Sequence, residues 1–174
     1  MSRVTRPRAG FALLLLALLA GSYALDAQVT GDRLLRAASE PHNWLTYGGT
    51  YSSQRYSTLD QITPANVARL ESKWVVQNQV FGAWQSNPIV VDGVMYITQR
   101  PNDVMAIDAK TGSLYWLYRH TPSADAKVCC GANNRGVAIL GDLVFMGTLD
   151  ARLIAIDRVS GKARWNIAVG EVKA

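Results

Sequence analysis

The same short motif occurs twice in this chain, at a fixed offset of 49 residues. Ala106–Trp116 aligns without gaps with Ala155–Trp165, and the two segments share an Ala-Ile-Asp start, a central glycine and a final tryptophan. Self-similarity at a period of about 40 to 50 residues is typical of β-propellers, in which each repeat forms one blade. The chain is therefore expected to fold as stacked repeats and not around a single compact core.

Each repeat also has the pattern of four strands. In the first repeat, Asp92-Gly93 joins two runs rich in β-forming residues, which is a strong hairpin signal; the second repeat has Gly141-Asp142 there, which suits the related turn with glycine first. A third run leads into a turn in which Gly112 can take a positive φ, and an outer run ends near Trp116–Tyr118. We therefore predict an all-β fold of propeller blades with four antiparallel strands in each blade.

Tryptophans lie in the outer runs at equivalent positions. We expect Trp116 and Trp165 each to dock its ring against a neighbouring repeat, where backbone groups of the turn fix its position; the alternative is an ordinary half-buried aromatic in each sheet. A third tryptophan, Trp74, lies in Glu71–Gln77, which has the character of a lone outer strand. The preceding segment, Thr63–Leu70, starts with a capping threonine and a proline and predicts a short helix.

These features divide the chain into four parts. Residues 1–24 form an export leader, residues 25–77 a segment with short helices and the outer closing strand, residues 78–120 the first propeller module and residues 121–174 the second. A propeller ring usually has about 4–8 blades, and two modules with one lone strand cannot close it. We therefore expect a truncated chain that forms part of an incomplete propeller; the alternative is a short protein that stacks with other chains.

The leader has the three regions of a signal peptide. Three arginines precede the apolar run Phe11–Ala20, and small residues follow it, with a cut after Ala24 and an alternative cut after Ala27. The apolar run is shorter than the roughly 20 residues that a membrane-spanning helix needs. We expect cleavage and export to the periplasm, with no membrane span in the mature chain; a retained membrane anchor is the alternative.

The net charge depends mostly on this leader. The whole chain has 18 basic and 13 acidic residues, a formal charge of +5. Loss of the three leader arginines leaves 15 basic residues and a charge of +2. The sequence therefore gives no argument for binding to nucleic acid or to an anionic membrane.

The only two cysteines of the chain, Cys129 and Cys130, are neighbours. Export permits a disulfide between them. Such a bond would close an eight-membered ring and crosslink almost nothing, so a stabilising role explains it poorly. The α-carbons of adjacent residues lie closer than those of a usual disulfide, so the oxidised pair would be strained, and strain of this kind is typical of functional sites.

With these motifs placed, the chain after the leader resembles the amino-terminal part of the pyrroloquinoline-quinone (PQQ)-dependent alcohol dehydrogenases, the methanol and ethanol dehydrogenase family of quinoproteins. The residues that carry the resemblance, besides the blade motifs, are Asn43-Trp44, Tyr47-Gly48, Arg55–Leu59, Ile62, Asn66-Val67, Trp74, Cys129-Cys130 and Asn134–Gly136. The cysteine pair five residues before an arginine is the most specific part of this pattern, because related sugar-oxidising quinoproteins lack it.

The resemblance implies an eight-bladed propeller with PQQ in its axial funnel, between a vicinal disulfide and a tryptophan from a later blade. Cys129 and Cys130 would then lie against one face of the planar quinone. Arg135 matches the arginine that contacts the carboxylates of the cofactor, because a guanidinium forms paired, charge-assisted hydrogen bonds with a carboxylate. Gln85 stands where methanol-oxidising members have a cofactor-binding glutamate, and a plain strand-edge glutamine is the alternative. Asn134 is expected only to shape the turn.

The family chemistry needs residues that this chain does not supply. In the family, Ca²⁺ or a related ion polarises a quinone carbonyl, an aspartate takes the proton of the alcohol, and hydride passes to the quinone. None of these metal ligands or bases maps onto the chain, and His42 and His120 have no carboxylate or cysteine at ligand spacing, so we expect both histidines to be solvent-facing or structural.

Two functions remain open from the sequence. The first is the amino-terminal part of a periplasmic PQQ-dependent dehydrogenase that oxidises a primary alcohol and passes electrons to a cytochrome c or a fused haem domain, the 174 residues alone being inactive. The second is a non-enzymatic β-propeller scaffold that binds protein partners. The adjacent cysteines favour the first function, because a scaffold has no use for a strained redox pair.

Overall fold

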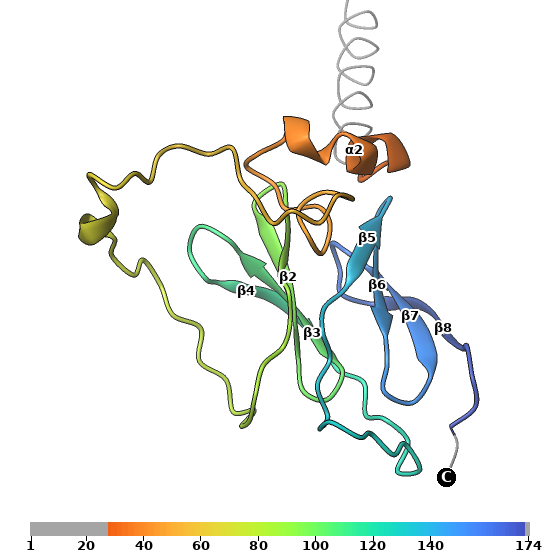
Figure 1. Cartoon of the computed structure of the whole chain (residues 1–174). Helices are drawn as coiled ribbons and strands as arrows, with labels where there is room; N and C mark the ends of the chain where they lie inside the picture. Colours follow the sequence, from red (N-terminus) through yellow and green to blue (C-terminus); the bar gives the residue numbers. More distant parts are fainter. Residues whose placement is uncertain (1–27, 173–174) are drawn as a thin grey trace, which may run out of the picture.

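The computed structural model of the chain describes residues 28–172 and consists of two antiparallel sheets of four strands, each in sequential order (Figure 1). The first sheet contains β1 (Ile89–Val91), β2 (Val94–Gln99), β3 (Asp103–Asp108) and β4 (Leu114–Tyr118). The second sheet contains β5 (Ala138–Leu140), β6 (Leu143–Gly147), β7 (Arg152–Asp157) and β8 (Ala163–Ala168). The expected blades of four strands are confirmed. The expected leader lies outside the described residues.

Both predicted hairpins form, and each uses the turn that its glycine position favours. In the first hairpin, Asp92 and Gly93 have φ values of 52° and 80°, so both central residues are left-handed, as a type I′ turn requires. In the second hairpin, Gly141 has a φ of 59° and Asp142 has no positive φ, which fits the turn with glycine first. The turn residues thus fix the register of β1 with β2 and of β5 with β6.

The two sheets repeat the same aromatic pair between their second and fourth strands. The ring centroids of Tyr96 and Trp116 lie 5.9 Å apart with an angle of 45° between the planes. The corresponding values for Phe145 and Trp165 are 5.8 Å and 49°. Tilted rings at this separation are favourable beyond the apolar area that they bury. The 49-residue repeat in the sequence therefore corresponds to a repeat in packing.

One hydrophobic cluster joins both sheets to the amino-terminal segment. It consists of Val29, Leu34, Ala37, Leu45, Ile89, Val91, Tyr96, Val104, Ala106, Ile139, Val144, Met146, Ile154 and Ile156. Because the cluster draws on three separate parts of the chain, the two sheets are held against each other by shared burial of apolar surface.

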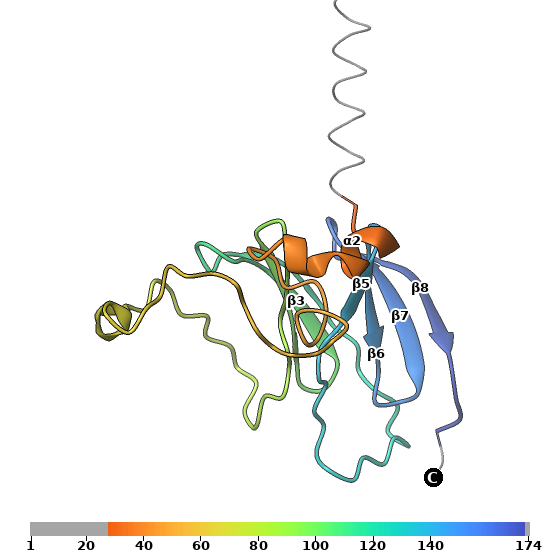
Figure 2. The same ribbon diagram turned by 45° about the horizontal axis from the view of Figure 1, so that its top comes forward.

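The amino-terminal segment lies across one end of both sheets (Figures 1 and 2). It contains the short helix α2 (Gly31–Leu35), which the hydroxyl of Thr30 caps, and the 3₁₀ turn η1 (Ala37–Ser39). Isolated β-bridges pair Val29 with Gly141 and Trp44 with Val90, so this segment contacts an inner hairpin of each sheet.

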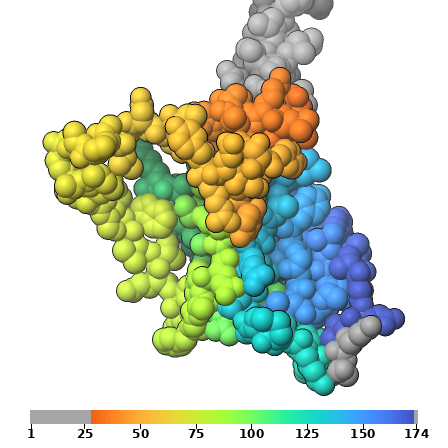
Figure 3. Space-filling view, viewed as in Figure 1, coloured from red at the N-terminus to blue at the C-terminus, as the bar shows by residue number. Residues whose placement is uncertain are grey.

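An arm of exposed chain follows this segment and curves away from the sheets (Figures 1 and 3). The only regular element in it is the 3₁₀ turn η2 (Val67–Arg69), so the short helix expected over Thr63–Leu70 is present only as this turn. Asn66 accounts for the difference, because its side-chain oxygen accepts a hydrogen bond from the backbone N–H of Thr63 and its amide donates to Gln61. These bonds favour a turn over a continuing helix. Residues 71–77 join neither sheet.

Two of the tryptophans dock on the repeat that follows them in the chain, as was expected for Trp116. The indole N–H of Trp74 donates to the carbonyl of Ala109 at 3.2 Å, and that of Trp116 donates to the carbonyl of Arg158 at 3.0 Å. The two accepting residues are themselves 49 positions apart, so both rings occupy the same place on successive sheets. Each ring thereby links two repeats through one turn.

Glycines make room for these rings. A Cβ atom placed on Gly112 would lie 2.7 Å from the Trp74 ring, and one on Gly161 would lie 2.7 Å from the Trp116 ring. Both glycines also have positive φ, 76° and 69°. A side chain at either position would therefore collide with the indole as well as strain the backbone. Docking of Trp165 remains a prediction, since residues 28–172 contain no further sheet.

Within the described residues, no helix has the length and apolar character needed to cross a membrane.

Candidate cofactor site

Two loops that precede the inner strands meet side by side at the end of the sheets away from α2. One loop, residues 81–87, leads into β1, and the other, residues 129–136, leads into β5. Asn87 forms a parallel β-bridge with Gly136, and its backbone N–H donates to the carbonyl of Arg135 at 3.1 Å. Gly136 has a φ of 128°, and a Cβ there would lie 2.9 Å from the carbonyl oxygen of Asn87. Glycine therefore permits this close approach.

The side chains of Arg135 and Gln85 contact each other across these loops. The Nε of Arg135 donates to the Oε1 of Gln85 at 3.2 Å, although the two residues are 50 positions apart. Arg135 is exposed, so most of its guanidinium donors remain available to an anion. The pair thus presents a permanent positive charge beside an amide that can both donate and accept hydrogen bonds.

The hydroxyl groups of buried Thr98 and partly buried Ser86 connect the two loops. The backbone N–H of Thr98, which is 1% exposed, donates to the hydroxyl oxygen of Ser86 at 2.8 Å. The Thr98 hydroxyl lies 2.9 Å from the Ser86 hydroxyl and 3.3 Å from the carbonyl oxygen of Asn134. Strand β2 therefore supports both loops. Thr98 and Ser86 could not be predicted as part of the site, because isolated hydroxyl residues form no sequence pattern of their own.

Asn134 has the structural role that was expected for it, and the structure extends this role to the next sheet. Its side-chain oxygen accepts from the backbone N–H of Gly136 at 3.1 Å, which shapes the turn. Its amide donates to the carbonyl of Gly147 at 2.8 Å and to the Oδ1 of Asn102 at 3.2 Å. Asn102 is completely buried and links the first sheet to Leu149 in the second. The loop of residues 129–136 is thus anchored in both sheets.

The two cysteines are exposed and carry free thiols in this structure. A hydrogen bond with Cys129 raises the pKa of the Cys130 thiol, and the charge of Cys129 acts in the same direction, whereas Arg135 opposes both effects. The thiols therefore interact closely enough for one to affect the ionisation of the other, and the positive charge of Arg135 acts on the same place. The disulfide between them stays a prediction.

His120 has a carboxylate partner, which corrects the expectation that it is isolated. Its Nε2 lies 3.0 Å from both side-chain oxygens of Asp150, thirty positions away. Burial acts to raise the pKa of Asp150, but hydrogen bonds from Thr148, His120 and the Ser123 backbone outweigh burial and lower it. This buried pair holds the start of the segment that leads to the cysteines, so His120 is structural. His42 is exposed, as expected.

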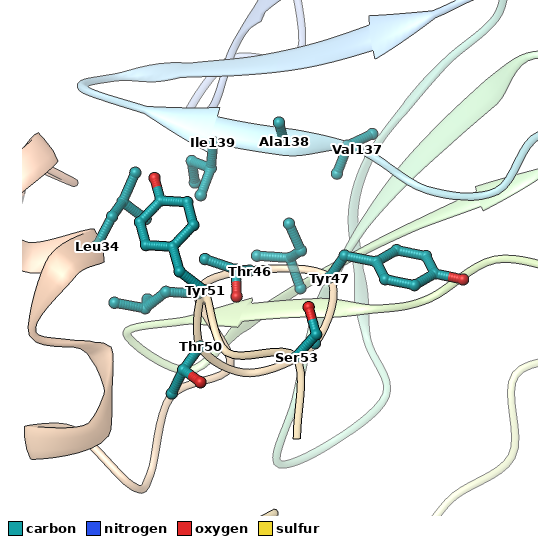
Figure 4. Close-up of a pocket in the computed structure, with 12 residues that line it drawn as sticks. Leu34, Thr46, Tyr47, Thr50, Tyr51, Ser53, Val137, Ala138 and Ile139 are labelled. Atoms are coloured by element: carbon teal, nitrogen blue, oxygen red, sulfur yellow. The ribbon is translucent and has the colours of Figure 1, made fainter. Parts of the chain in front are cut away.

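A separate apolar pocket of about 290 Å³ lies between the amino-terminal segment and the inner strands β1 and β5 (Figure 4). The ring of Tyr51 lies beside Leu34, whereas Tyr47 points away from the pocket. Half of the lining residues are aliphatic, Ile139 among them, and no cationic residue lines the pocket. A ligand rich in carboxylates would find its counter-charge at Arg135 and not here.

The described part of the chain contains no group of three or more His, Cys, Asp or Glu side chains that could hold a metal ion.

Together, the fold and the site define a class of protein: β-propeller blades whose adjoining loops carry an arginine, an amide and a pair of neighbouring thiols. The family model described as the β-propeller domain of glucose, ethanol and alcohol dehydrogenases that use PQQ matches residues 44–168. The chain therefore belongs to the PQQ-dependent alcohol dehydrogenase family.

Similar proteins are bacterial and much longer. The dehydrogenase subunit of an alcohol dehydrogenase (quinone) from Gluconacetobacter polyoxogenes is 43% identical over 140 residues, which cover 79% of this chain and 19% of that protein. Quinohemoprotein alcohol dehydrogenase ADH-IIG from Pseudomonas putida is 41% identical over 169 residues, which cover 92% of this chain and 23% of that protein. The chain thus spans about a fifth of the length of these relatives.

Solved structures agree with the fold. A quinohemoprotein alcohol dehydrogenase from Pseudomonas putida HK5 matches with a TM-score of 0.80 and 41% identity, over 83% of this chain and 21% of that one. A europium-containing methanol dehydrogenase matches with a TM-score of 0.75 and 33% identity, over 81% of this chain and 25% of that one. The resemblance inferred from the sequence is confirmed, and the roles of the individual site residues remain predictions.

Proposed function

We propose that this chain forms the first blades of a PQQ-dependent dehydrogenase that oxidises primary alcohols. The observation that carries the proposal is the contact between Arg135 and Gln85, which joins two residues far apart in sequence beside the adjacent cysteines. Family membership and the fold support it. Because the chain spans about a fifth of its curated relatives, the activity belongs to the complete protein.

The residues of the site fit a flat quinone with carboxylate groups. Arg135 would bind a carboxylate through charge-assisted hydrogen bonds, which Lys could not reproduce with the same planar geometry. Gln85, which accepts a hydrogen bond from Arg135, would orient that guanidinium and could donate its amide N–H groups to the cofactor. Cys129 and Cys130 would cover one face with polarisable sulfur and keep water from it.

Bound PQQ would supply the hydride acceptor, and Ca²⁺ or a related ion would supply the Lewis acid. The contribution of these blades is to bind and orient the cofactor and to shield one of its faces. The catalytic base and the metal ligands would come from other blades of the complete protein, so we expect the 174 residues alone not to oxidise alcohols.

The location and electron acceptor follow the same proposal. The leader directs the chain to the periplasm, where a disulfide between Cys129 and Cys130 can persist. A cytochrome c or a fused haem domain would take the electrons, and the occurrence of quinohemoproteins among the relatives supports a haem partner. A small primary alcohol is the substrate.

The test is dye-linked alcohol oxidation by the complete protein, produced in the periplasm and reconstituted with PQQ and Ca²⁺. We expect ethanol oxidation that needs PQQ, and we expect a large loss of activity in the Cys129→Ser/Cys130→Ser double variant. The 174-residue chain serves as the inactive control. Tight binding of PQQ by the complete protein, measured by fluorescence quenching, separates cofactor binding from turnover.

A complete protein that folds but neither binds PQQ nor oxidises any alcohol would contradict the proposal. The non-enzymatic scaffold would then be the better explanation of the fold.

A further inference from the structure

Arg100 lies at the end of β2, under the two loops that carry the candidate site residues. Its Nε donates to the carbonyl of Ala132 at 3.2 Å, two residues after the cysteine pair. Its Nη1 donates to the carbonyl of Phe81 at 3.3 Å, in the loop that carries Gln85. One guanidinium therefore bridges the two loops through backbone carbonyls, while Arg135 and Gln85 join them through side chains.

A glycine on one of the two loops makes room for the guanidinium. A Cβ on Gly82 would overlap the Nη1 of Arg100, and Gly82 has a φ of 116°, which side chains rarely adopt. On the other loop, a Cβ on Gly131 would lie 3.9 Å from Nη2, at ordinary contact distance. Gly131 directly follows Cys130, and the carbonyl that accepts from Arg100 Nε belongs to the next residue, Ala132.

The geometry suits arginine in particular. The planar guanidinium has donors on several edges, so it can serve two carbonyls that face it from different directions. A lysine ammonium is a single point of charge and would not span both loops in the same way. Glutamine keeps a polar end but loses the charge that strengthens both hydrogen bonds.

We propose that Arg100 is a positioning residue that holds the Cys129–Cys130 loop in the shape that favours the disulfide. Its relevance for the cofactor rests on the proposed function, but its effect on the cysteines does not. A loop that is already fixed loses less conformational freedom when the eight-membered ring closes. The hydrogen bonds from Arg100 should therefore favour the disulfide over the two thiols. A residue that directly follows β2 would thereby set the thiol–disulfide equilibrium of Cys129 and Cys130 on a neighbouring loop.

The test measures the thiol–disulfide equilibrium of Cys129 and Cys130 in the complete protein in glutathione buffers, read by mass spectrometry of the peptide that contains both cysteines after acid quenching and alkylation. In the reaction, the thiols of Cys129 and Cys130 form one S–S bond, and the S–S bond of oxidised glutathione breaks. The two electrons and two protons pass to glutathione, which leaves as two reduced molecules.

We expect Arg100→Gln to lower the equilibrium constant for disulfide formation about tenfold, the effect of losing one hydrogen bond from a charged donor. That change corresponds to a reduction potential about 30 mV less negative. Arg100→Lys should give an intermediate value. The matched control is Arg119→Gln, because the Arg119 side chain is 73% exposed and lies 3.8 Å from Asp103. Within residues 28–172 it forms no hydrogen bond or ion pair with either loop, so this variant should match the wild type.

A shift of less than about threefold in a folded Arg100→Gln variant, or a shift towards the disulfide, would overturn the inference. Tryptophan fluorescence reports whether each variant is folded. If Arg100→Gln does not fold, the Arg100→Lys variant provides the test. An equilibrium constant for disulfide formation equal to that of the wild type rejects the role of Arg100, and a shift towards the dithiol supports it. Because the measurement needs no PQQ, it stays valid if the complete protein proves not to oxidise alcohols.

Discussion

The indole N–H of Trp116 donates to the carbonyl of Arg158 at 3.0 Å, and this bond joins the outer strand of the first sheet to the turn of the second. The same carbonyl lies 3.4 Å from the hydroxyl of Tyr96. One backbone oxygen next to β7 in the second sheet thus accepts hydrogen bonds from two aromatic side chains of the first sheet. The contact between the sheets is therefore specific as well as apolar.

Substitution of Trp116 should separate these two contributions. Trp116→Phe keeps most of the ring but loses the hydrogen bond, so we expect a loss of about 1 kcal/mol in the free energy of unfolding. Trp116→Ala also loses the packing, and we expect about 3 kcal/mol. Urea unfolding of the chain provides the measurement. Trp165→Phe is the control, since the Trp165 indole makes no hydrogen bond within residues 28–172; an equal loss in both Phe variants would contradict the docking role.

Gly161 should not tolerate alanine. The added methyl group would approach the Trp116 ring to 2.7 Å at a backbone φ of 69°, so either the ring or the turn must move. We expect Gly161→Ala to cost about 1–3 kcal/mol in the free energy of unfolding. Gly147→Ala is a suitable comparison, because nothing lies within 4 Å of its added Cβ. Comparable denaturation midpoints for the two variants would show that the ring is not held there.

Asp157 should contribute stability that depends on pH. The Arg164 side chain, followed by the backbone and hydroxyl of Ser160, lowers the pKa of Asp157 below its ordinary value of 3.8. A carboxyl with a lowered pKa in the folded state stabilises the fold above its unfolded pKa, and this stability is lost as the pH falls through the folded pKa.

We therefore expect Asp157→Asn to destabilise the chain by about 1 kcal/mol at pH 7 and by progressively less below about pH 4. Chemical denaturation at a series of pH values gives the comparison. Asp60→Asn, a change of an exposed aspartate in the arm, should have little effect at any pH. A constant difference between wild type and Asp157→Asn from pH 2 to pH 7 would exclude the ionised carboxylate as the cause.

Arg135 should matter for cofactor affinity in the complete protein. Loss of a charge-assisted hydrogen bond costs about 1.5–3 kcal/mol, so Arg135→Gln should weaken PQQ binding by about tenfold to a hundredfold. Arg135→Lys should fall between wild type and Arg135→Gln, because it keeps the charge without the planar fork. Fluorescence titration with PQQ measures these constants. Unchanged affinity in Arg135→Gln would place the carboxylate-binding group elsewhere.

Local features of the sequence were enough to predict the blades. The Asp92-Gly93 and Gly141-Asp142 turns, the positive φ of Gly112 and the docking of Trp116 all follow from residues within one repeat or from the repeat itself. These features allow few alternative folds, because the turn residues and the fixed repeat offset restrict how the strands can pair. The short helix expected at residues 63–70 is limited to the 3₁₀ turn at Val67–Arg69 for a local reason, since the Asn66 side chain forms hydrogen bonds with the backbone.

Contacts between repeats could not be predicted in the same way. The pairs His120 with Asp150 and Arg100 with Ala132 join residues about thirty positions apart on different elements. Their meeting depends on how two sheets and two loops are placed relative to each other, and no periodic pattern encodes that placement. Arg135 was identified through its family motif, whereas its contact with Gln85 became visible only in the folded chain.

The direction of tryptophan docking has a consequence for the order in which the molecule becomes stable. Trp74 and Trp116 each take their partner carbonyl from the repeat made after them, Ala109 in one case and Arg158 in the other. During synthesis, the indole of each unit therefore lacks its hydrogen-bond partner until the following repeat has been made. The repeats should therefore become stable in order from the amino terminus to the carboxyl terminus, each one after the next repeat has been synthesised.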